Sequence, residues 1–393
     1  MPELRTETMT VNMGPQHPST HGVLRLVLRL DGENVVSSAS TVGYLHTGIE
    51  KTIEQKKFQQ VIPLVERMDY LSAQSNSLGF ALSVEKLLGM EVPDRVKWIR
   101  VLLAELQRLN SHLVWLATHG MEVGAVTVML YCFRERELFL NINELIAGFR
   151  MFPSYIRVGG LREDLPPGFH AAVKEVLDRM PAKLAEYEDL LTHNQIYIKR
   201  TRGVGAISLN DAYDLGLVGP IARAAGSTYD VRKAFPYSGY ETFDFDVPAG
   251  SAGDVYDRYL VRMEEMYQSL RICYQALDRI TPTGAWAADD PRVVPPPKDK
   301  VYTEMEALIY HFLIHSQGFT VPAGEAYVPV EGPRGEHGCY VVSDGSNRPW
   351  RVKMRSPSLM ACQALPKLIV GGLIADVIAV IGSIDVVLGD VDR

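Results

Sequence analysis

The pattern of apolar residues changes at residue 64, and this change constrains the fold more than any other feature of the chain. From Leu64 onward, apolar residues recur at helical spacing in long runs. In the clearest run, Asp94 is a good N-cap and Gly120 is a good stop. The sequence predicts helices over residues 64–89, 95–120, 126–149, 170–191, 252–280 and 302–316.

Before residue 64 the chain reads as β structure. Residues 23–30 alternate apolar and polar side chains, Asp31-Gly32 is a strong turn signal, and a second run covers residues 35–42. The sequence therefore predicts an N-terminal β-hairpin. We place a domain boundary at Pro63, with an N-terminal α/β unit over residues 1–63 and a helical domain over residues 64–393.

A polar loop with two histidines leads directly into this hairpin. Pro15 and Pro18 restrict the backbone, so His17 and His21 cannot lie one turn apart on a helix and form a helical metal pair. His21 is thus expected at the root of the hairpin. It either caps the loop or acts as a proton donor, since an imidazole titrates near neutral pH.

The last third of the chain contains a second β segment and an apolar run. Residues 325–355 alternate as three strands, and we expect them to join the N-terminal hairpin in one sheet. Residues 368–389 are apolar except for Asp376 and Asp385, each of which would cost about 2.5 to 3.5 kcal/mol near a bilayer centre. We therefore expect a buried helix followed by a short buried segment, and contact with a membrane only through a partner.

Composition excludes several classes of protein. The formal net charge is −7 and no run of basic residues is present, so nucleic acid is not an expected partner. The N-terminus lacks the apolar segment of a secretory signal, and a reducing compartment is expected. The cysteines are scattered without a CxxC pair, which argues against a zinc site or an iron-sulfur cluster held by this chain; they are Cys132, Cys273, Cys339 and Cys362.

Charged and metal-binding side chains on the predicted helices allow two further expectations. The run Arg134-Glu135-Arg136-Glu137 interrupts an apolar helix, so its charges must pair or face a polar cavity. His311 and His315 are four residues apart, the one arrangement that could place two imidazoles on a metal ion. No third ligand is evident, and we favour a structural role.

Several long motifs in sequence order resemble one family over about residues 11–393. The motifs are GPQHPSTHGVLR, GYLHTGIEK, ERMDYL, FRERE, YIRVGG and GSIDVVLGDVDR. The family that they resemble is the 49 kDa, or D-type, subunit of proton-pumping NADH:quinone oxidoreductase, respiratory complex I.

The resemblance implies a fold and an activity. The fold would be α+β and mainly α, similar to the large subunit of nickel-iron hydrogenases, with an N-terminal β-hairpin unit and a small C-terminal antiparallel sheet. In those hydrogenases four cysteines hold the metals, whereas here Asp69 and Ser72 stand at the first pair and the tail has no cysteine. The resemblance thus implies that the metal site has become a quinone pocket, where reduction is coupled to proton translocation.

The resemblance also implies roles for individual residues. His21 and Tyr70 would bind the quinone head group and act catalytically as proton donors. Glu122 stands where the family usually has an aspartate that pairs with this histidine, and it is the third catalytic candidate. Arg67 matches an arginine near the partner's terminal 4Fe-4S cluster.

Two positions depart from the family pattern. Thr47 replaces an arginine, and Phe152 replaces a histidine that many members have beside the cluster. Any contact made by the arginine is therefore absent, and a role of position 152 in coupling cluster reduction to a proton is in doubt.

The resemblance implies partners and a location as well. The expected neighbours in the complex are the B-type chain with the terminal 4Fe-4S cluster, the C-type chain, the ferredoxin-like I-type chain and the H-type membrane chain. No cofactor or metal is expected on this chain, and quinone is its substrate. The expected location is the cytoplasmic side of the bacterial inner membrane, where the chain would be peripheral.

Two readings from other classes remain open. The chain could be a non-catalytic scaffold of a related membrane oxidoreductase, although a scaffold has no reason to keep both His21 and Tyr70. It could also be a metalloenzyme that uses His311 and His315, which would require a stoichiometric metal.

Overall fold

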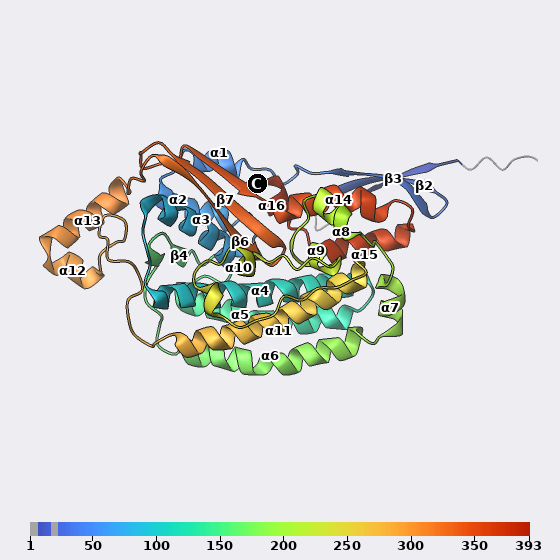
Figure 1. The fold of residues 1–393 in the computed structure, drawn as a ribbon, viewed down its shortest axis with the longest axis horizontal. Coiled ribbons are helices and arrows are strands. Elements are labelled where there is room, and N and C mark those ends of the chain that lie inside the picture. The colour runs from blue at the N-terminus through green and yellow to red at the C-terminus, as the bar shows by residue number, and fades with distance from the viewer. Residues whose placement is uncertain (1–6, 17–22) are drawn as a thin grey trace, which may run out of the picture.

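A bundle of four long helices forms one side of the molecule (Figure 1). The computed structural model describes residues 7–16 and 23–393. Within it, the bundle helices run side by side along the longest axis (Figure 1). They are α4 (Asp94–Glu122), α5 (Val126–Ala147), α6 (Phe169–Leu191) and α11 (Val255–Arg279). These elements confirm four of the predicted helices.

The longest helix, α4, organises the rest. At 29 residues it is about 44 Å long. It packs against α5 on one side and α11 on another. Its middle also contacts Leu71, through Gln107, and Arg334, through Ser111. Its apolar face is fully buried, as Leu102, Leu109 and Leu116 show. Side chains along α4 therefore face several different parts of the protein.

The predicted helix over residues 64–89 is wrong in its first two turns. Pro63 lies inside one helix, and a turn separates this helix from the next. The buried side-chain amide of Asn76 donates to the backbone carbonyl oxygens of Val65 and Asp69. A side chain of the next helix therefore holds the turn in place. The two helices are α2 (Phe58–Val65) and α3 (Ala73–Leu88).

The N-terminal sheet contains the predicted hairpin and one strand that we did not predict. Three strands pair antiparallel in the order β1-β2-β3, and an irregularity in the register lies at Arg29/Leu30. The predicted turn at Asp31-Gly32 is confirmed. The strands are β1 (Met9–Met13), β2 (Arg25–Asp31) and β3 (Asn34–Thr41).

The prediction of one joint sheet is wrong. Among the described residues, the C-terminal strands form a separate antiparallel sheet in the order β6-β7-β8. The outer edge of β3 is occupied instead by the backbone of the C-terminal region, since Val35 bonds to Gly371 and Gly372. The three predicted strands themselves are confirmed as β6 (Gly324–Gly332), β7 (Gly335–Ser343) and β8 (Arg351–Arg355).

The apolar run near the C-terminus forms the expected helix and then the expected buried segment, but the first half of the helix is partly exposed. Within the described ranges, no helix is both long enough and apolar enough to cross a membrane. The C-terminal helices are α14 (Pro357–Ile369), α15 (Ile374–Ile384) and α16 (Leu388–Asp392).

Two apolar clusters hold these parts together. One lies inside the bundle and extends to α2, α3 and the C-terminal sheet. The other lies between the N-terminal sheet and α14, α15 and α16. The chain is thus mixed α and β, mainly helical, with small antiparallel sheets. The domain boundary at residue 63 stays a prediction.

The remaining elements are short, and α12 and α13 project beyond one end of the bundle (Figure 1). The region between α6 and α11 contains four short helices and one 3-10 turn. Two further helices follow α11 before the C-terminal sheet. The elements are α1 (Ile49–Ile53), β4 (Ile156–Arg157), β5 (Gly160–Leu161), α7 (Gln195–Thr201), α8 (Leu209–Asp214), α9 (Gly219–Ala224), α10 (Val231–Ala234), η2 (Tyr240–Thr242), α12 (Lys298–Thr303) and α13 (Met305–Ser316).

Candidate functional site

Three segments that are distant in sequence meet around the turn between α2 and α3. They are this turn (residues 66–72), the loop at residues 42–48 and the tail (residues 385–393). The tail packs directly on the turn, because a Cβ at Gly389 would lie only 2.5 Å from the carbonyl oxygen of Met68. The Asp392 carboxylate accepts hydrogen bonds from the loop amides of Gly43 (2.8 Å) and Leu45 (2.6 Å).

A buried cluster of charges lies beneath the turn. Arg334, from the turn between β6 and β7, donates to Asp69 (3.1 Å) and to Asp385 (3.1 Å). It also donates to the hydroxyl of Ser111 on α4 (2.8 Å). Burial raises the pKa of Asp69 to about 6, because desolvation and the nearby carboxylates of Asp390 and Asp385 outweigh the opposing effect of Arg334. One guanidinium thus connects the turn, the tail and α4.

Tyr70 lies beside this cluster and is only partly buried. Desolvation raises the pKa of its phenol above the ordinary value, as do Asp69 and Asp385, while Arg334 opposes the shift. The hydroxyl accepts or donates no hydrogen bond among the residues that the structure describes. At neutral pH the phenol therefore keeps its proton, and its hydroxyl is free to bind another molecule.

The predicted location of Tyr70 on a helix is wrong. Its neighbour Leu71 offers a carbonyl oxygen to Gln107 of α4, at 2.6 Å from the amide nitrogen. This contact, and the ion pair of Asp69 with Arg334, which also donates to Ser111, hold the turn against the middle of α4. The side chain of Tyr70 is thus positioned by tertiary contacts rather than by helix geometry.

Arg67 and Phe152 are in contact at the outer side of the same turn. The Arg67 guanidinium lies 4.9 Å from the centre of the Phe152 ring and donates to the carbonyl oxygen of Pro63. Such a placement over an aromatic face is attractive for a cation. Arg67 is exposed, so its charge faces the exterior of this chain. The two residues that the sequence singled out separately belong to one feature.

Glu122 is not beside Tyr70. It is the last residue of α4, eleven residues beyond Ser111, which corresponds to about 16 Å along the helix axis. Its Oε2 atom is buried without a partner among the described residues, and burial raises its pKa to about 8. The structure therefore does not bring Tyr70 and Glu122 together directly. His21 lies outside the described residues, and its roles stay predictions.

Sequence reasoning missed the most buried members of the site. Arg334 was not singled out within the predicted strands of residues 325–355, and Asp385 was noted only as an interruption of an apolar run. An aspartate in an apolar run is a signal of a buried charge that needs a partner. The signal was visible for Asp385, but nothing in the sequence showed that the two side chains meet.

The charged run on α5 pairs as expected except at Arg136, whose Nε is buried without a hydrogen-bond partner among the described residues and whose guanidinium lies over the Phe133 ring. Glu135 is fully buried and pairs with Arg134 (2.6 Å) and with Arg179 of α6 (3.1 Å). Glu137 and Arg150 form an exposed pair instead. These charges therefore connect two helices of the bundle and take no part in the site.

The two histidines on α13 form a local contact. Their ring centres are 4.3 Å apart, and His315 Nδ1 is 2.8 Å from the carbonyl oxygen of His311. Over residues 7–16 and 23–393, no group of three or more metal-binding side chains is close enough to hold a metal ion. The four cysteines are free and buried.

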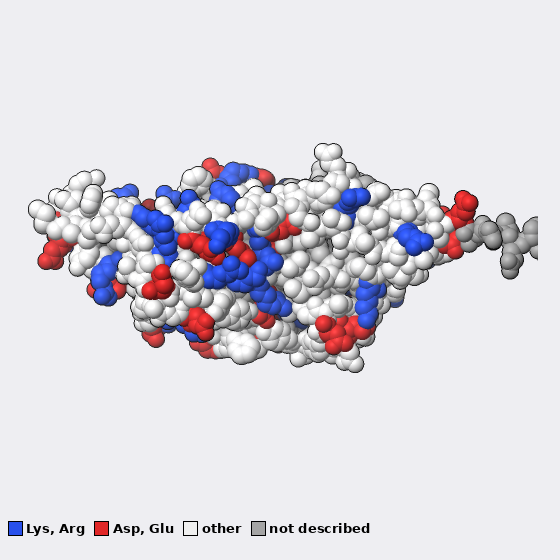
Figure 2. Space-filling model, turned by 90° about the horizontal axis from the view of Figure 1, so that it is seen from above, with Lys and Arg blue, Asp and Glu red and all other residues white. Residues whose placement is uncertain are grey.

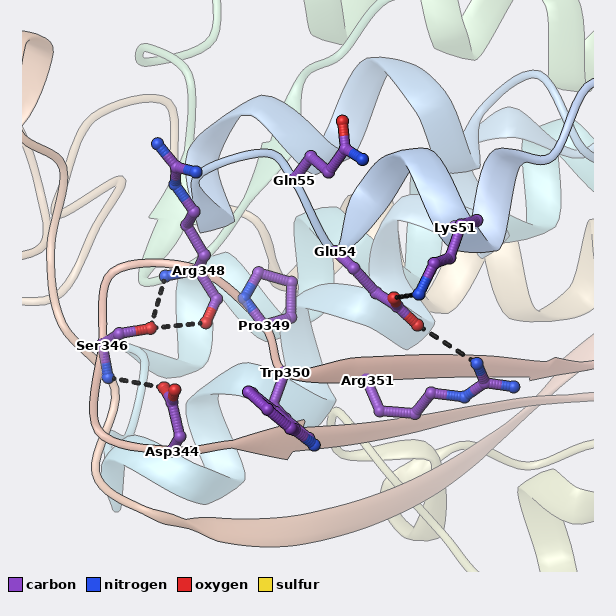
Figure 3. Close-up of a pocket in the computed structure, with 9 residues that line it drawn as sticks. All are labelled: Lys51, Glu54, Gln55, Asp344, Ser346, Arg348, Pro349, Trp350 and Arg351. Atoms are coloured by element: carbon purple, nitrogen blue, oxygen red, sulfur yellow. Dashed lines mark hydrogen bonds and ion pairs between the residues drawn. The ribbon is translucent and has the colours of Figure 1, made fainter.

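A separate hollow of about 530 Å³ opens on the surface between α1 and the loop that leads into β8 (Figure 3). Trp350 and Arg348 line one side of it, and Glu54 lies opposite, bound to Lys51 and Arg351. On the face seen from above, basic side chains stand next to acidic ones (Figure 2). Tyr70, Arg67 and Glu122 do not line this hollow.

Comparison with known proteins defines the class and then the family. A family model described as "Respiratory-chain NADH dehydrogenase, 49 Kd subunit" matches residues 122–393. The chain is 57% identical over 385 residues to the D 1 subunit of the NADH-quinone oxidoreductase of Solibacter usitatus, covering 98% of this chain and 94% of that protein. It is 53% identical over 388 residues to the D subunit of the NADH-quinone oxidoreductase of Geotalea uraniireducens, covering 99% of both.

These matches place the chain in the class of respiratory-chain oxidoreductase subunits. The chain belongs to the 49 kDa, or D-type, subunit family of NADH-quinone oxidoreductase. The resemblance seen in the sequence motifs is therefore confirmed, and the chain is one component of an enzyme complex.

Proposed function

We propose that this chain forms the quinone-reduction site of a complex I together with a neighbour that carries the terminal 4Fe-4S cluster. Support comes from the neutral phenol of Tyr70, which lies at the junction of three segments beside the buried cluster of Arg334, Asp69 and Asp385. This is the observation that carries the proposal. The fold would be that of a hydrogenase large subunit whose metal site has become the pocket.

The contact between turn and tail supports the vacated-site interpretation. Asp69 and Ser72 stand at the first cysteine positions of hydrogenases, and the tail corresponds to the second motif. In this chain Gly389 lies against the backbone of the turn, so the two segments are adjacent. Carboxylate and hydroxyl groups replace thiolates there, and they suit hydrogen bonding rather than nickel and iron.

The chemistry of the reaction fits these groups. A quinone that accepts two electrons from the neighbouring subunit must also take two protons to become a quinol. Tyr70 can give one proton from its hydroxyl, and His21 would give the other from its imidazole. The exposed positive charge of Arg67 would favour the reduced form of a cluster that docks against it. Glu122 would serve as an internal source of protons for His21.

The proposal extends to the assembly. Neighbours of the B, C, I and H types would surround the chain, and the complex would couple electron transfer to proton translocation. The chain itself would be peripheral, on the cytoplasmic side of the membrane. No cofactor of its own is needed, because electrons arrive from the neighbouring chain and quinone is the substrate.

Replacement of Tyr70 by phenylalanine tests the proposal. The variant keeps the ring and loses only the hydroxyl, so quinone reductase activity of the assembled complex should fall about 100- to 10,000-fold. Reduction of the terminal cluster by the upstream donor should be unchanged. Tyr302→Phe, at a highly exposed tyrosine on α12, is the matched control and should keep full activity. Near-full quinone turnover in an assembled Tyr70→Phe complex would show that the pocket lies elsewhere.

A further inference from the structure

The contact between α4 and α15 contains a space that only a glycine leaves open. Trp115 on α4 donates its indole N–H to the carbonyl oxygen of Gly382 on α15 (2.9 Å). A Cβ at Gly382 would overlap Glu122 Oε2 and lie 2.9 Å from His119 Nδ1. Both polar atoms therefore point at the same spot, and a side chain at position 382 would occupy it.

Neither of these two atoms has another partner among the described residues. Glu122 Oε2 and His119 Nδ1 are both buried and make no hydrogen bond there. A buried polar atom without a partner is costly, and most such atoms are paired directly or through a water molecule. Because both atoms lie so close to the Gly382 position, a direct hydrogen bond or a single bridging water can join them.

The surroundings fix the protonation of the histidine. Its other nitrogen, Nε2, is 3.1 Å from the hydroxyl of Tyr197 on α7. Burial and the nearby guanidinium groups of Arg262 and Arg258 on α11 lower the pKa of His119 to about 3, so the ring is neutral at pH 7. The ring also stacks on Trp115, with 5.5 Å between the ring centres.

The surroundings of Glu122 raise its pKa, whereas those of His119 lower the pKa of the imidazole. Burial raises the pKa of Glu122 to about 8, so at pH 7 the carboxyl group carries a proton. A protonated carboxyl can donate a hydrogen bond, whereas the free nitrogen of a neutral imidazole can accept one. The donor and the acceptor therefore match.

We propose that Glu122 and His119 share one proton as a buried pair, and that Gly382 is a positioning residue that leaves space for this pair. This inference deepens the proposed function, because the role of the pair in quinone reduction rests on the proposed quinone site. The pair would hold a proton that can be passed to the quinone site and replaced afterwards. The glutamate of this chain, one methylene longer than aspartate, needs the space at Gly382 to reach the histidine.

Infrared spectroscopy of the assembled complex tests the pair without any quinone turnover. The stretching band of a protonated carboxylic acid should be present and should vanish in Glu122→Gln. His119→Phe keeps an aromatic ring on Trp115 but removes Nδ1, so the band should shift to higher frequency. Tyr197→Phe removes only the partner of Nε2 and should leave the band nearly unchanged. A Glu122 band that is absent at pH 7, or that is identical in His119→Phe, would overturn the inference.

A size exchange tests the role of Gly382. Gly382→Ala should displace the Glu122 carboxyl and lower quinone reductase activity about 100-fold. The double variant Gly382→Ala with Glu122→Asp should recover most of this activity, because the shorter side chain leaves room for the methyl group. Gly372→Ala, where a Cβ would meet only a backbone oxygen at 3.3 Å, is the control and should have no effect.

The two experiments separate the inference from the proposed function. If the infrared band shifts in His119→Phe but Tyr70→Phe keeps full turnover, the pair exists and the proposed quinone site is wrong. If Tyr70→Phe loses activity while Gly382→Ala keeps both activity and the unshifted band, the proposed site stands and the pair is wrong.

Discussion

At the scale of single residues, Glu122 gives the clearest dependence on pH. Burial raises the pKa of its carboxyl to about 8, so the group holds a proton at pH 7 and loses it as the pH rises through 8. A carboxylate can no longer donate. We therefore expect quinone reductase activity of the complex to fall as the pH rises through about 8, if Glu122 supplies protons to the site.

The variant Glu122→Gln removes this ionisation. Its activity should be lower at pH 7, since an amide does not release a proton, and the decline near pH 8 should be absent from its profile. Glu137→Gln, at an exposed glutamate of α5, should keep the parent profile. Superimposable pH profiles for the parent and Glu122→Gln would contradict the role of this carboxyl.

Sequence reasoning at this scale found residues but not their neighbours. Tyr70, Arg67 and Glu122 were singled out by the resemblance to the family. That Tyr70 stands on a turn follows from Asn76, Gln107 and Arg334, which reach the turn from three other elements. The local sequence pattern of residues 66–72 cannot show these contacts, because the contacting side chains belong to other elements. Such tertiary contacts override the helical preference of the turn residues.

At the scale of elements, one buried glutamate joins α4 to three other parts of the chain. Glu105 accepts from Arg108, from Arg232 of α10 (3.1 Å), from Tyr240 (2.7 Å) and from Ser269 of α11 (2.7 Å). Burial alone would raise its pKa, but the two guanidinium groups dominate and lower it to about 2. This carboxylate is therefore charged and fully paired.

Removal of Glu105 should destabilise the bundle strongly. Glu105→Ala leaves buried guanidinium groups without their carboxylate, which typically costs about 3 to 5 kcal/mol in free energy of unfolding. Glu137→Ala breaks only an exposed pair with Arg150 and should cost less than about 1 kcal/mol. Urea unfolding of the full chain, followed by circular dichroism, compares the two. Equal unfolding midpoints would show that the buried network contributes nothing to stability.

A second prediction at this scale concerns the contact between Arg67 of the α2–α3 turn and Phe152. Phenylalanine cannot take up a proton, so the potential of a cluster docked beside Arg67 should depend little on pH. Phe152→His would add a titratable ring at this place, and the potential should then fall as the pH rises. A redox titration of the assembled complex at several pH values measures this. A slope near one proton per electron in the parent would contradict the prediction.

The elements themselves were largely predictable. Helical periodicity predicted α4, α5, α6 and α11, and turn residues predicted the pairing of β2 with β3 and of β6 with β7. Two of the differences have a physical cause in common. The turn before α3 and the separation of the two sheets both depend on hydrogen bonds between the backbone and groups outside the local pattern: Gln107 for the turn, and Gly371 and Gly372 for the edge of β3.

At the scale of the whole molecule, the C-terminal tail determines the shape of the site. The tail (residues 385–393) is almost entirely buried, and it contacts the loop at residues 42–48, the α2–α3 turn and, through Asp385, the turn between β6 and β7. The buried ion pairs of Arg334 then fix these parts relative to α4. The central claim is that quinone is reduced at this junction of turn and tail.

Labelling with a photoreactive quinone tests this claim most directly. Illumination of the assembled complex with the bound probe, followed by mass spectrometry of the digested chain, should place the label within residues 66–72 or 385–393. An excess of unmodified quinone should prevent this labelling, and Tyr302 and its neighbours on α12 should stay unlabelled. Label that competes with quinone but appears only outside the turn and the tail would contradict the account.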